Sequence, residues 1–314
     1  MVIDSEQSLK TPSPPAPPPL AGEGSAAARE GEPMQTSLGQ SKKLRVMVLC
    51  GRSPRHLYVA NALCKSADVL AIVQETGSAF TWKKLFKTLR PDNFARKVWR
   101  WLRDRRRYTG NREGQFFFGD QAPHLDHPAL VREFPHINHP DVVKLARELK
   151  PDILAVFGTS LIRGDLLKEG RLGIANLHGG LSPEYRGADC TFWALYNGEP
   201  EKVGCTLHWI DAGIDTGRLI AHISPEIQPD DDELRLFWRS VQTSANAYAE
   251  FLARTAAGER FGQSQPHKGR LYQVKQRGLR HERVVVRHLQ DGLLKNVQLG
   301  ARVSWFPVEP HTPG

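Results

Sequence analysis

The stretch GIANLHGGLSPEYRGADCTFWALYNGEP, residues 173–200, decides how the rest of the sequence is interpreted. It opens with a short apolar run typical of a buried strand. The run ends in Asn176 and His178, and a loop rich in Gly, Pro and charged residues leads from it to an expected helix. Residues two apart on a strand face the same side of a sheet, so Asn176 and His178 are expected to share one side while Leu177 packs on the other.

Strands and helices alternate on both sides of this stretch. Expected strands lie at 44–50, 68–75, 152–159, 173–178, 204–210 and 217–224, and expected helices at 56–67, 141–150, about 161–169, 189–198 and 231–257. This alternation predicts an α/β fold, a Rossmann-like and mainly parallel sheet flanked by helices. The strands at 204–210 and 217–224 are expected to form an antiparallel extension.

Composition divides the chain into three parts. Residues 1–43 are rich in Pro, Ala, Gly and Ser and predict a disordered tail, because they bury too little apolar surface to order. Residues 44–262 are expected to form the main domain. Residues 263–314 hold nine Lys or Arg, with expected strands at 269–274 and 283–289, and predict a small basic β appendage.

Residues 76–120 interrupt the alternation as a basic helical insertion. Between Lys83 and Arg107 there are eleven Lys or Arg and two Asp. Apolar side chains recur there at helical spacing: Phe80, Trp82, Leu85, Phe86 and Leu89, then Phe94, Val98 and Leu102. Either the insertion packs on the domain with its basic face in solvent, or residues 80–107 touch a membrane surface or nucleic acid.

Charge and cysteine content limit the function classes. The 314 residues carry a formal net charge of +9, which suggests anionic partners. The four cysteines have no Cys-x-x-Cys spacing, so a structural zinc site is not indicated and a reducing, cytoplasmic location is expected. No apolar run approaches a membrane span, and the N-terminus lacks the apolar core of a signal peptide.

The common nucleotide and hydrolase motifs are missing, and one polar constellation remains. The first strand is followed by CGRSPRH rather than a Gly-x-Gly-x-x-Gly or P-loop motif, and no Gly-x-Ser-x-Gly elbow occurs. An Asn amide and a protonated His both donate hydrogen bonds, so Asn176 and His178 could stabilise an oxyanion. Asp215 could favour the imidazolium and move a proton. Each piece alone also fits an ordinary strand end or turn.

Taken together, the residues NLHGGLSPEYRGADCTFWALYNGEPEKVGCTLHWIDAGIDTGRLI, 176–220, resemble the folate-dependent formyltransferase family. That family includes glycinamide ribonucleotide, methionyl-tRNA and sugar N-formyltransferases. Its pattern is Asn-x-His-x-Ser-Leu-Leu-Pro-x-Tyr-Arg-Gly, followed about 35 residues later by Asp-x-Gly-x-Asp-x-Gly. The resemblance runs from about 44 to 258 and is sharpest over 173–221.

The resemblance implies a mechanism and a donor. The family's catalytic residues fall on Asn176, His178 and Asp215, and 10-formyltetrahydrofolate would donate the formyl group to an amine without a metal or a covalent enzyme intermediate. The folate is expected between the strand ending at Thr159 and the 211–217 loop. Its apolar wall and hydrogen-bonding edge are expected to come from four residues: Leu161, Ile162, Asp211 and Gly213.

Other residues of the motif keep two interpretations each. Arg186 either fixes its own loop or meets an anionic substrate. Asp189 is expected to cap the following helix, with recognition of a substrate amine as the alternative, and His208 is either a neighbour of the site or a core histidine. Gly180 and Ser182 depart from the family's Ser and second Leu, so the geometry of this loop is expected to differ.

The resemblance leaves the acceptor open. By elimination, we expect a small-molecule amine with anionic character, such as an amino sugar or a nucleotide-linked amino sugar. Methionyl-tRNA is the alternative, because the segment after the main domain is basic. An alternative of another class is a non-catalytic protein that binds membranes or nucleic acid on a relic fold. The oligomeric state is not indicated.

Overall fold

The computed structural model describes residues 43–77, 98–99, 101–105, 107–295 and 297–308. The expected tail at 1–43 lies outside these residues except for Lys43, as does most of the expected insertion at 76–120, including its apolar positions from Phe80 to Phe94. The structure therefore tests the expectation of a membrane-contacting segment at 80–107 only at its end.

Eight strands of the described chain form one sheet, in the order β10-β8-β7-β5-β4-β1-β2-β3. Their bounds are β1 Arg45–Cys50, β2 Asp68–Glu75, β3 Val131–Phe134, β4 Ile153–Phe157, β5 Gly173–His178, β7 Cys205–Trp209, β8 Leu219–Ser224 and β10 Arg302–Trp305. The strands from β5 to β3 are parallel, whereas β7, β8 and β10 continue the sheet antiparallel from β5. The Rossmann-like α/β fold and its antiparallel extension are confirmed.

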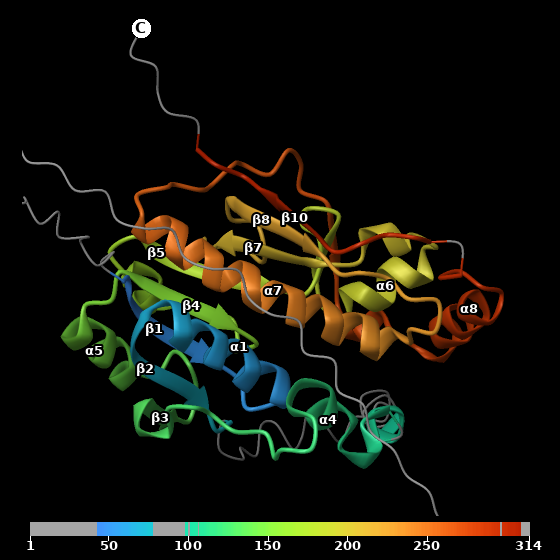
Figure 1. Cartoon of the computed structure of the whole chain (residues 1–314), viewed down its shortest axis with the longest axis horizontal. Helices are drawn as coiled ribbons and strands as arrows, with labels where there is room; N and C mark the ends of the chain where they lie inside the picture. Colours follow the sequence, from blue (N-terminus) through green and yellow to red (C-terminus); the bar gives the residue numbers. More distant parts are fainter. Residues whose placement is uncertain (1–42, 78–97, 100, 106, 296, 309–314) are drawn as a thin grey trace, which may run out of the picture. The chain divides into compact units, whose positions relative to one another are not determined.

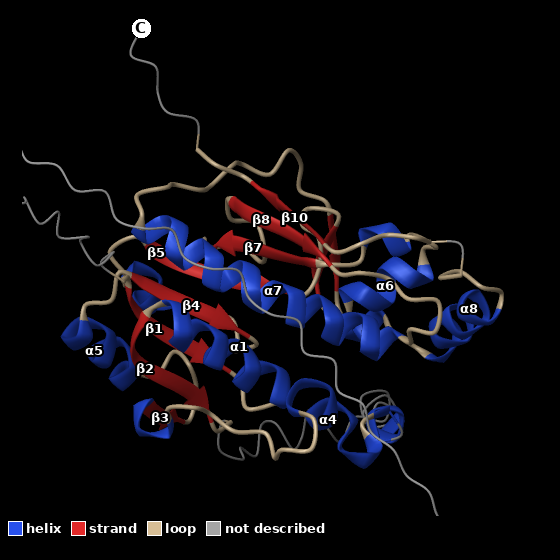
Figure 2. Cartoon of the chain, in the orientation of Figure 1, coloured by secondary structure: helices blue, strands red, loops and turns tan. Residues whose placement is uncertain are grey.

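Helices cover both faces of the sheet (Figures 1 and 2). The helices α1 (Pro54–Ser66) and α7 (Glu233–Ala256) lie side by side on one face, and α5 (Pro140–Leu149) lies on the other. Alternate side chains of β1 pack in the two hydrophobic cores, one on each face of the sheet. Val46 and Val48 face α1 and α7, whereas Met47 faces α5. This period of two is expected for a strand buried on both faces.

A third core lies beyond the sheet, where α6 (Cys190–Tyr196) packs against α8 (Leu279–Gln290). Both helices lie together on the right of Figure 1. The short strands β6 (Tyr185–Gly187) and β9 (Arg270–Tyr272) pair parallel beside them. Helix α4 (Arg112–Phe118) packs against α1 and α7.

Two expected elements differ in the structure. The expected strand at 283–289 is part of helix α8, in which Val285 is buried and Leu289, one turn later, is partly buried. Contact with α6 along one helical stripe outweighs the strand preference of the three consecutive valines. The expected helix at 161–169 is only the 3₁₀ turn Gly164–Lys168.

The described part of 263–314 contacts the rest of the chain through two strands. Strand β10 extends the main sheet and strand β9 pairs with β6. The division of the chain at residue 262 stays a prediction. No helix in the described ranges is both long and apolar enough to cross a bilayer.

Candidate active site at the end of strand β5

A cavity of about 620 Å³, here the first cavity, opens at the carboxyl ends of β4 and β5. This is where ligands bind in open α/β sheets. It lies between the end of β4 and the loop 211–217, as the sequence predicts for the donor. Eight of the predicted site residues line it: Asn176, His178, Asp215, Leu161, Ile162, Asp211, Gly213 and His208.

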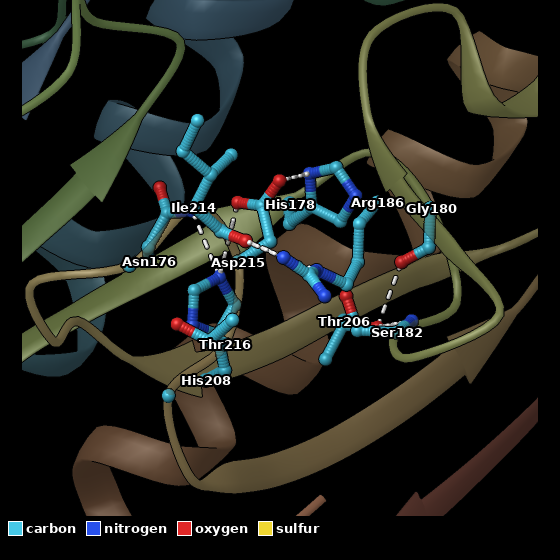
Figure 3. Close-up of polar contacts among 12 residues, drawn as sticks. Asn176, His178, Gly180, Ser182, Arg186, Thr206, His208, Ile214, Asp215 and Thr216 are labelled. Carbon is cyan, nitrogen blue, oxygen red and sulfur yellow. Dashed lines mark hydrogen bonds and ion pairs between the residues drawn. The ribbon is translucent and has the colours of Figure 1, made fainter. Parts of the chain in front are cut away.

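The three predicted catalytic side chains meet at one end of this cavity (Figure 3). Asp215 lies between two imidazoles: its Oδ2 is 3.5 Å from His178 Nδ1 and its Oδ1 is 3.6 Å from His208 Nε2. The backbone N–H of Gly187 donates to Asp215 Oδ2 at 2.9 Å. The carboxylate is thus held by groups from β5, β7 and the loop after β5.

His208 fixes the amide of Asn176. The two residues pair across β5 and β7, and Asn176 Nδ2 lies 3.1 Å from His208 Nε2. His208 Nδ1 lies 2.9 Å from the carbonyl of Trp209, which can only accept, so Nδ1 carries a proton. In the neutral ring Nε2 then accepts one Asn176 N–H. His208 is therefore a buried neighbour of the predicted catalytic residues rather than an unrelated core histidine.

His178 is enclosed by acceptors. Its Nε2 lies 3.0 Å from the carbonyl of Tyr185, and its Nδ1 faces Asp215. Burial lowers the pKa of His178, while the Asp215 charge and the Tyr185 carbonyl act to raise it. Both ring nitrogens thus face protein groups, and His178 borders the cavity through the rest of its ring.

Asp215 is ionised in this setting. Burial acts to raise its pKa, but the imidazoles of His178 and His208 and the N–H of Gly187 more than offset this and lower the pKa to about 2. A carboxyl group with a lower pKa in the folded state stabilises the fold while it is ionised. That contribution is present above the unfolded-state pKa of about 4 and is lost as the pH falls towards 2.

We expect this contribution to appear as a pH-dependent difference between the wild type and Asp215→Asn. The free energy of unfolding of the wild type should fall by roughly 2 kcal/mol more than that of the variant between about pH 5 and about pH 2. Urea unfolding at several pH values measures this. A difference between the two proteins that stays constant over the range would contradict the assignment of an ionised Asp215.

Exposed apolar side chains surround the first cavity. Leu161, Ile214 and Val274 are 42%, 40% and 36% exposed, unusually high for large apolar residues, and all three line the cavity. Ile162 lies deeper and is buried. The carboxylate of Asp211 instead accepts from Gly213 N at 2.9 Å, so it shapes its own loop. The cavity therefore offers apolar walls of the kind that enclose a flat ring.

Two residues of the loop after β5 have structural roles. Arg186 is buried and donates to the carbonyls of Ile214 and Lys268. These bonds fix its loop, as the first of the two interpretations of Arg186 predicts. The expectation that Asp189 caps α6 is wrong: its side chain accepts no hydrogen bond from that helix. It pairs instead with Arg277, at 3.0 Å, because that cation lies against the start of α6.

Gly180 and Ser182, which differ from the family pattern, lie in a tightly packed part of the loop. A Cβ added at Gly180 would lie 2.5 Å from the carbonyl oxygen of Tyr185 and 2.8 Å from Cys190 Sγ. Thr206 Oγ1 donates to the carbonyl of Gly180 at 2.7 Å and accepts from Ser182 N at 2.8 Å (Figure 3). Cys190 Sγ lies 3.6 Å from His178 Nε2, and burial raises the pKa of this thiol well above its ordinary value.

A second cavity, of about 330 Å³, lies on the other side of the loop after β5. It shares Gly179 and Gly187 with the first cavity. Its lining is charged and aromatic: Arg55, Arg103, Asp104, Arg107, Tyr108, Asp189, Phe192, Glu233, Phe237 and Arg277. The predicted catalytic side chains line the first cavity, which adjoins the second at these two glycines.

Known proteins share both the sequence and the fold of this region. Residues 120–252 match the formyl transferase family. These residues are similar to a formyl transferase domain. The matched region includes Asn176, His178 and Asp215, and it ends before residue 263.

The relatives cover only part of this protein. The chain is 33% identical over 142 residues to methionyl-tRNA formyltransferase of Chlorobium chlorochromatii, 44% of this chain and 45% of the relative. It is 40% identical over 120 residues to methionyl-tRNA formyltransferase of Geobacter metallireducens, 38% of each chain. The alignments therefore span less than half of these relatives. A sugar N-formyltransferase from Shewanella has the same fold, with a TM-score of 0.51 and 14% identity, covering 82% of this chain and 98% of that one.

The sequence does not point to several residues that line the two cavities. Ile214 follows Gly213 within an expected turn, and Val274 lies 59 residues beyond Asp215 in the chain. The only available signal was that Ile214 is a large apolar residue inside a turn rich in Asp and Gly. Nothing local placed Val274 or Arg277 near the site.

Proposed function

We propose that this chain transfers a formyl group from 10-formyltetrahydrofolate to the primary amine of a small molecule, in particular an amino sugar. The observation that carries the proposal is that Asn176, His178 and Asp215 together line the first cavity, which adjoins the second cavity at Gly179 and Gly187. One cavity is apolar and the other is charged, which suits a donor and an acceptor of different chemistry.

The first cavity fits the donor. The exposed apolar side chains of Leu161, Ile214 and Val274 suit the faces of a pterin ring, and the backbone of the loop 211–215 suits its polar edge. Its volume of about 620 Å³ is in the range of cavities that hold cofactors. The donor supplies the formyl carbon and takes up a proton on its leaving nitrogen.

The contacts of Asn176, His178 and Asp215 suggest a separate role for each residue. Asn176, oriented by His208, donates an amide hydrogen bond to the formyl oxygen as it becomes an oxyanion. His178, when protonated, places a positive charge beside the same oxygen. Asp215 stabilises that imidazolium and receives the proton that the attacking amine loses, directly or through water.

The second cavity fits a compact polar acceptor. Among the described residues each guanidinium of its lining has a carboxylate partner: Arg55 with Glu113, Arg103 with Asp104, Arg107 with Glu233, and Arg277 with Asp189 and Glu233. The positive charge of this lining is thus largely neutralised by its carboxylate partners. Paired charges and aromatic rings offer donors, acceptors and flat faces to the hydroxyl groups and ring of a sugar.

Methionyl-tRNA is the second candidate acceptor. It is favoured by the names of the relatives that are 33% and 40% identical to this chain. Those alignments cover 44% and 38% of this chain. The described part of 263–314 forms β9, α8 and β10, which pack on the rest of the described chain. An amino-sugar acceptor accounts for the small second cavity more directly.

A panel of amines tests the proposal. The full chain is incubated with 10-formyltetrahydrofolate and either free amino sugars, nucleotide-linked amino sugars, glycinamide ribonucleotide or methionyl-tRNA. We expect tetrahydrofolate release and a formylated product, detected by mass spectrometry, with an amino sugar. Turnover only with methionyl-tRNA would overturn the proposal that the acceptor is an amino sugar. No turnover with any amine, together with tight salt-sensitive binding to vesicles or RNA, would overturn the enzyme.

A further inference from the structure

Residues 263–277, which we call the strap, cross from the edge of the main sheet to the start of α8. They lie after the region that matches the formyl transferase family. The strap reaches both cavities, because Val274 lines the first and Arg277 lines the second. It makes three separate contacts with the loops that hold the catalytic residues.

The first contact holds the loop of Asp215. The side-chain amide of Gln265 donates to the carbonyl of Asp215 at 2.9 Å and to that of Gly217 at 2.8 Å. Arg186 joins the strap to the same loop, since it donates both to the carbonyl of Lys268 and to that of Ile214. The backbone of the Asp215 loop is therefore anchored on strap residues.

The second contact is the ladder between β6 and β9. Tyr185, Arg186 and Gly187 pair with Arg270, Leu271 and Tyr272, and Ala188 N donates to the carbonyl of Tyr272 at 3.0 Å. The rings of Tyr185 and Tyr272 stack with centroids 5.5 Å apart. Gly187 has a φ of +92°, and a Cβ there would collide with the Tyr272 carbonyl, so the two backbones pack as closely as glycine allows.

The third contact centres on Arg277, whose side chain is 1% exposed. Its guanidinium bonds Asp189 at 3.0 Å, Glu233 at 2.8 and 2.9 Å and Glu282 at 2.7 Å, and lies 3.7 Å from the ring centre of Phe192. Asp189 itself has a left-handed backbone with a φ of +57°. A residue in that conformation persists when its surroundings hold it, and Arg277 supplies that hold.

Two residues that these contacts hold also hydrogen-bond to His178 and Asp215. Tyr185, held by the ladder, offers its carbonyl to His178 Nε2, and Gly187 donates its N–H to Asp215 Oδ2. We propose that the strap is a positioning element of the active site, in which Gln265 and the Asp189–Arg277 pair fix the orientation of His178 and Asp215. The catalytic part of this inference rests on the proposed function, whereas the geometry does not.

Single substitutions test each contact. Asp189→Asn keeps the shape of the side chain and removes its charge from Arg277, and Gln265→Leu removes the two hydrogen bonds to the Asp215 loop. Arg277→Lys keeps the charge but loses the forked geometry. The matched controls are Lys275→Met and Gln263→Leu, which change exposed side chains of the same strap.

The first readout needs no substrate. The ¹⁵N chemical shifts of the His178 ring, assigned with His178→Gln, report the tautomer and hydrogen bonding of His178 in the full chain at fixed pH. We expect Asp189→Asn and Gln265→Leu to shift these signals while both controls leave them in place. Unchanged His178 signals in both folded variants would overturn the inference whatever the enzyme acts on.

The second readout is kinetic. With an amine that is turned over, we expect Asp189→Asn and Gln265→Leu to lower kcat about tenfold while KM for the donor changes less than about twofold. Arg277→Lys should retain more activity than Arg277→Met. If the His178 signals move but no amine is formylated, the strap's role in positioning stands and the proposed function fails. Wild-type kcat in both variants would overturn the catalytic part of the inference.

Discussion

Asp215→Asn is expected to lower kcat for formyl transfer roughly a thousandfold with little loss of fold, the largest catalytic effect of any single change in this chain. The amide can still accept the N–H of Gly187, so the loop keeps that anchor. It carries no charge to stabilise an imidazolium at His178, 3.5 Å away, and no basic oxygen for the proton of the attacking amine.

The contrast between kcat and KM makes this test specific. Leu161→Asp places a charge on the apolar wall of the first cavity and should raise KM for 10-formyltetrahydrofolate while kcat changes much less. Asp230→Asn, the same chemical change at an exposed site, should leave both constants unchanged. An Asp215→Asn enzyme with more than about a tenth of wild-type kcat would contradict the assigned role of this carboxylate.

Gly180→Ser, which restores the serine of the family pattern, is expected to destabilise this protein by about 2–4 kcal/mol and to reduce activity more than tenfold. The new Cβ would lie 2.5 Å from the Tyr185 carbonyl oxygen and 2.6 Å from Cys190 Cβ. Something must shift, and the Tyr185 carbonyl is the acceptor for His178 Nε2, so strain in the loop reaches the active site.

A second glycine provides the control. Nothing lies within 4 Å of the position that a Cβ would take at Gly300, so Gly300→Ser should leave thermal stability and kcat unchanged. The double variant Gly180→Ser/Cys190→Ala should recover only part of the loss, because the collision with the Tyr185 carbonyl remains. Wild-type melting temperature and activity in Gly180→Ser would show that this loop accommodates a side chain.

The placement of Asn176 and His178 was predictable because it follows local rules. The alternation of a strand puts Asn176 and His178 on one side, and the end of a parallel strand opens on a crevice. An Asp-Gly turn alone fits many strand connections, so the residues made Asp215 a candidate and the resemblance to a family singled it out. The sheet was predictable for a similar reason: each buried strand is a short apolar run with its own boundaries.

The role of Asp189 was not predictable because its partner is distant in sequence. A polar residue before a helix normally caps it, and that local rule predicts a cap. Arg277 lies 88 residues later and takes the carboxylate instead. Helix α8 was missed for a comparable reason, since three valines in a row favour a strand until packing against α6 is known. Sequence periodicity carries no information about such long-range contacts.

Strand β10 has a consequence for how this protein behaves outside its active site. It pairs along β8, whose residues Leu219, Ile220, Ala221 and Ile223 are all buried. Without β10, the backbone N–H and C=O groups of β8 would be unpaired at the edge of the sheet. Such an unpaired apolar edge can pair with strands of other chains. We therefore expect β10 to protect the folded chain from aggregation. A chain that is cut before Arg302 would expose the edge of β8 and would aggregate more readily.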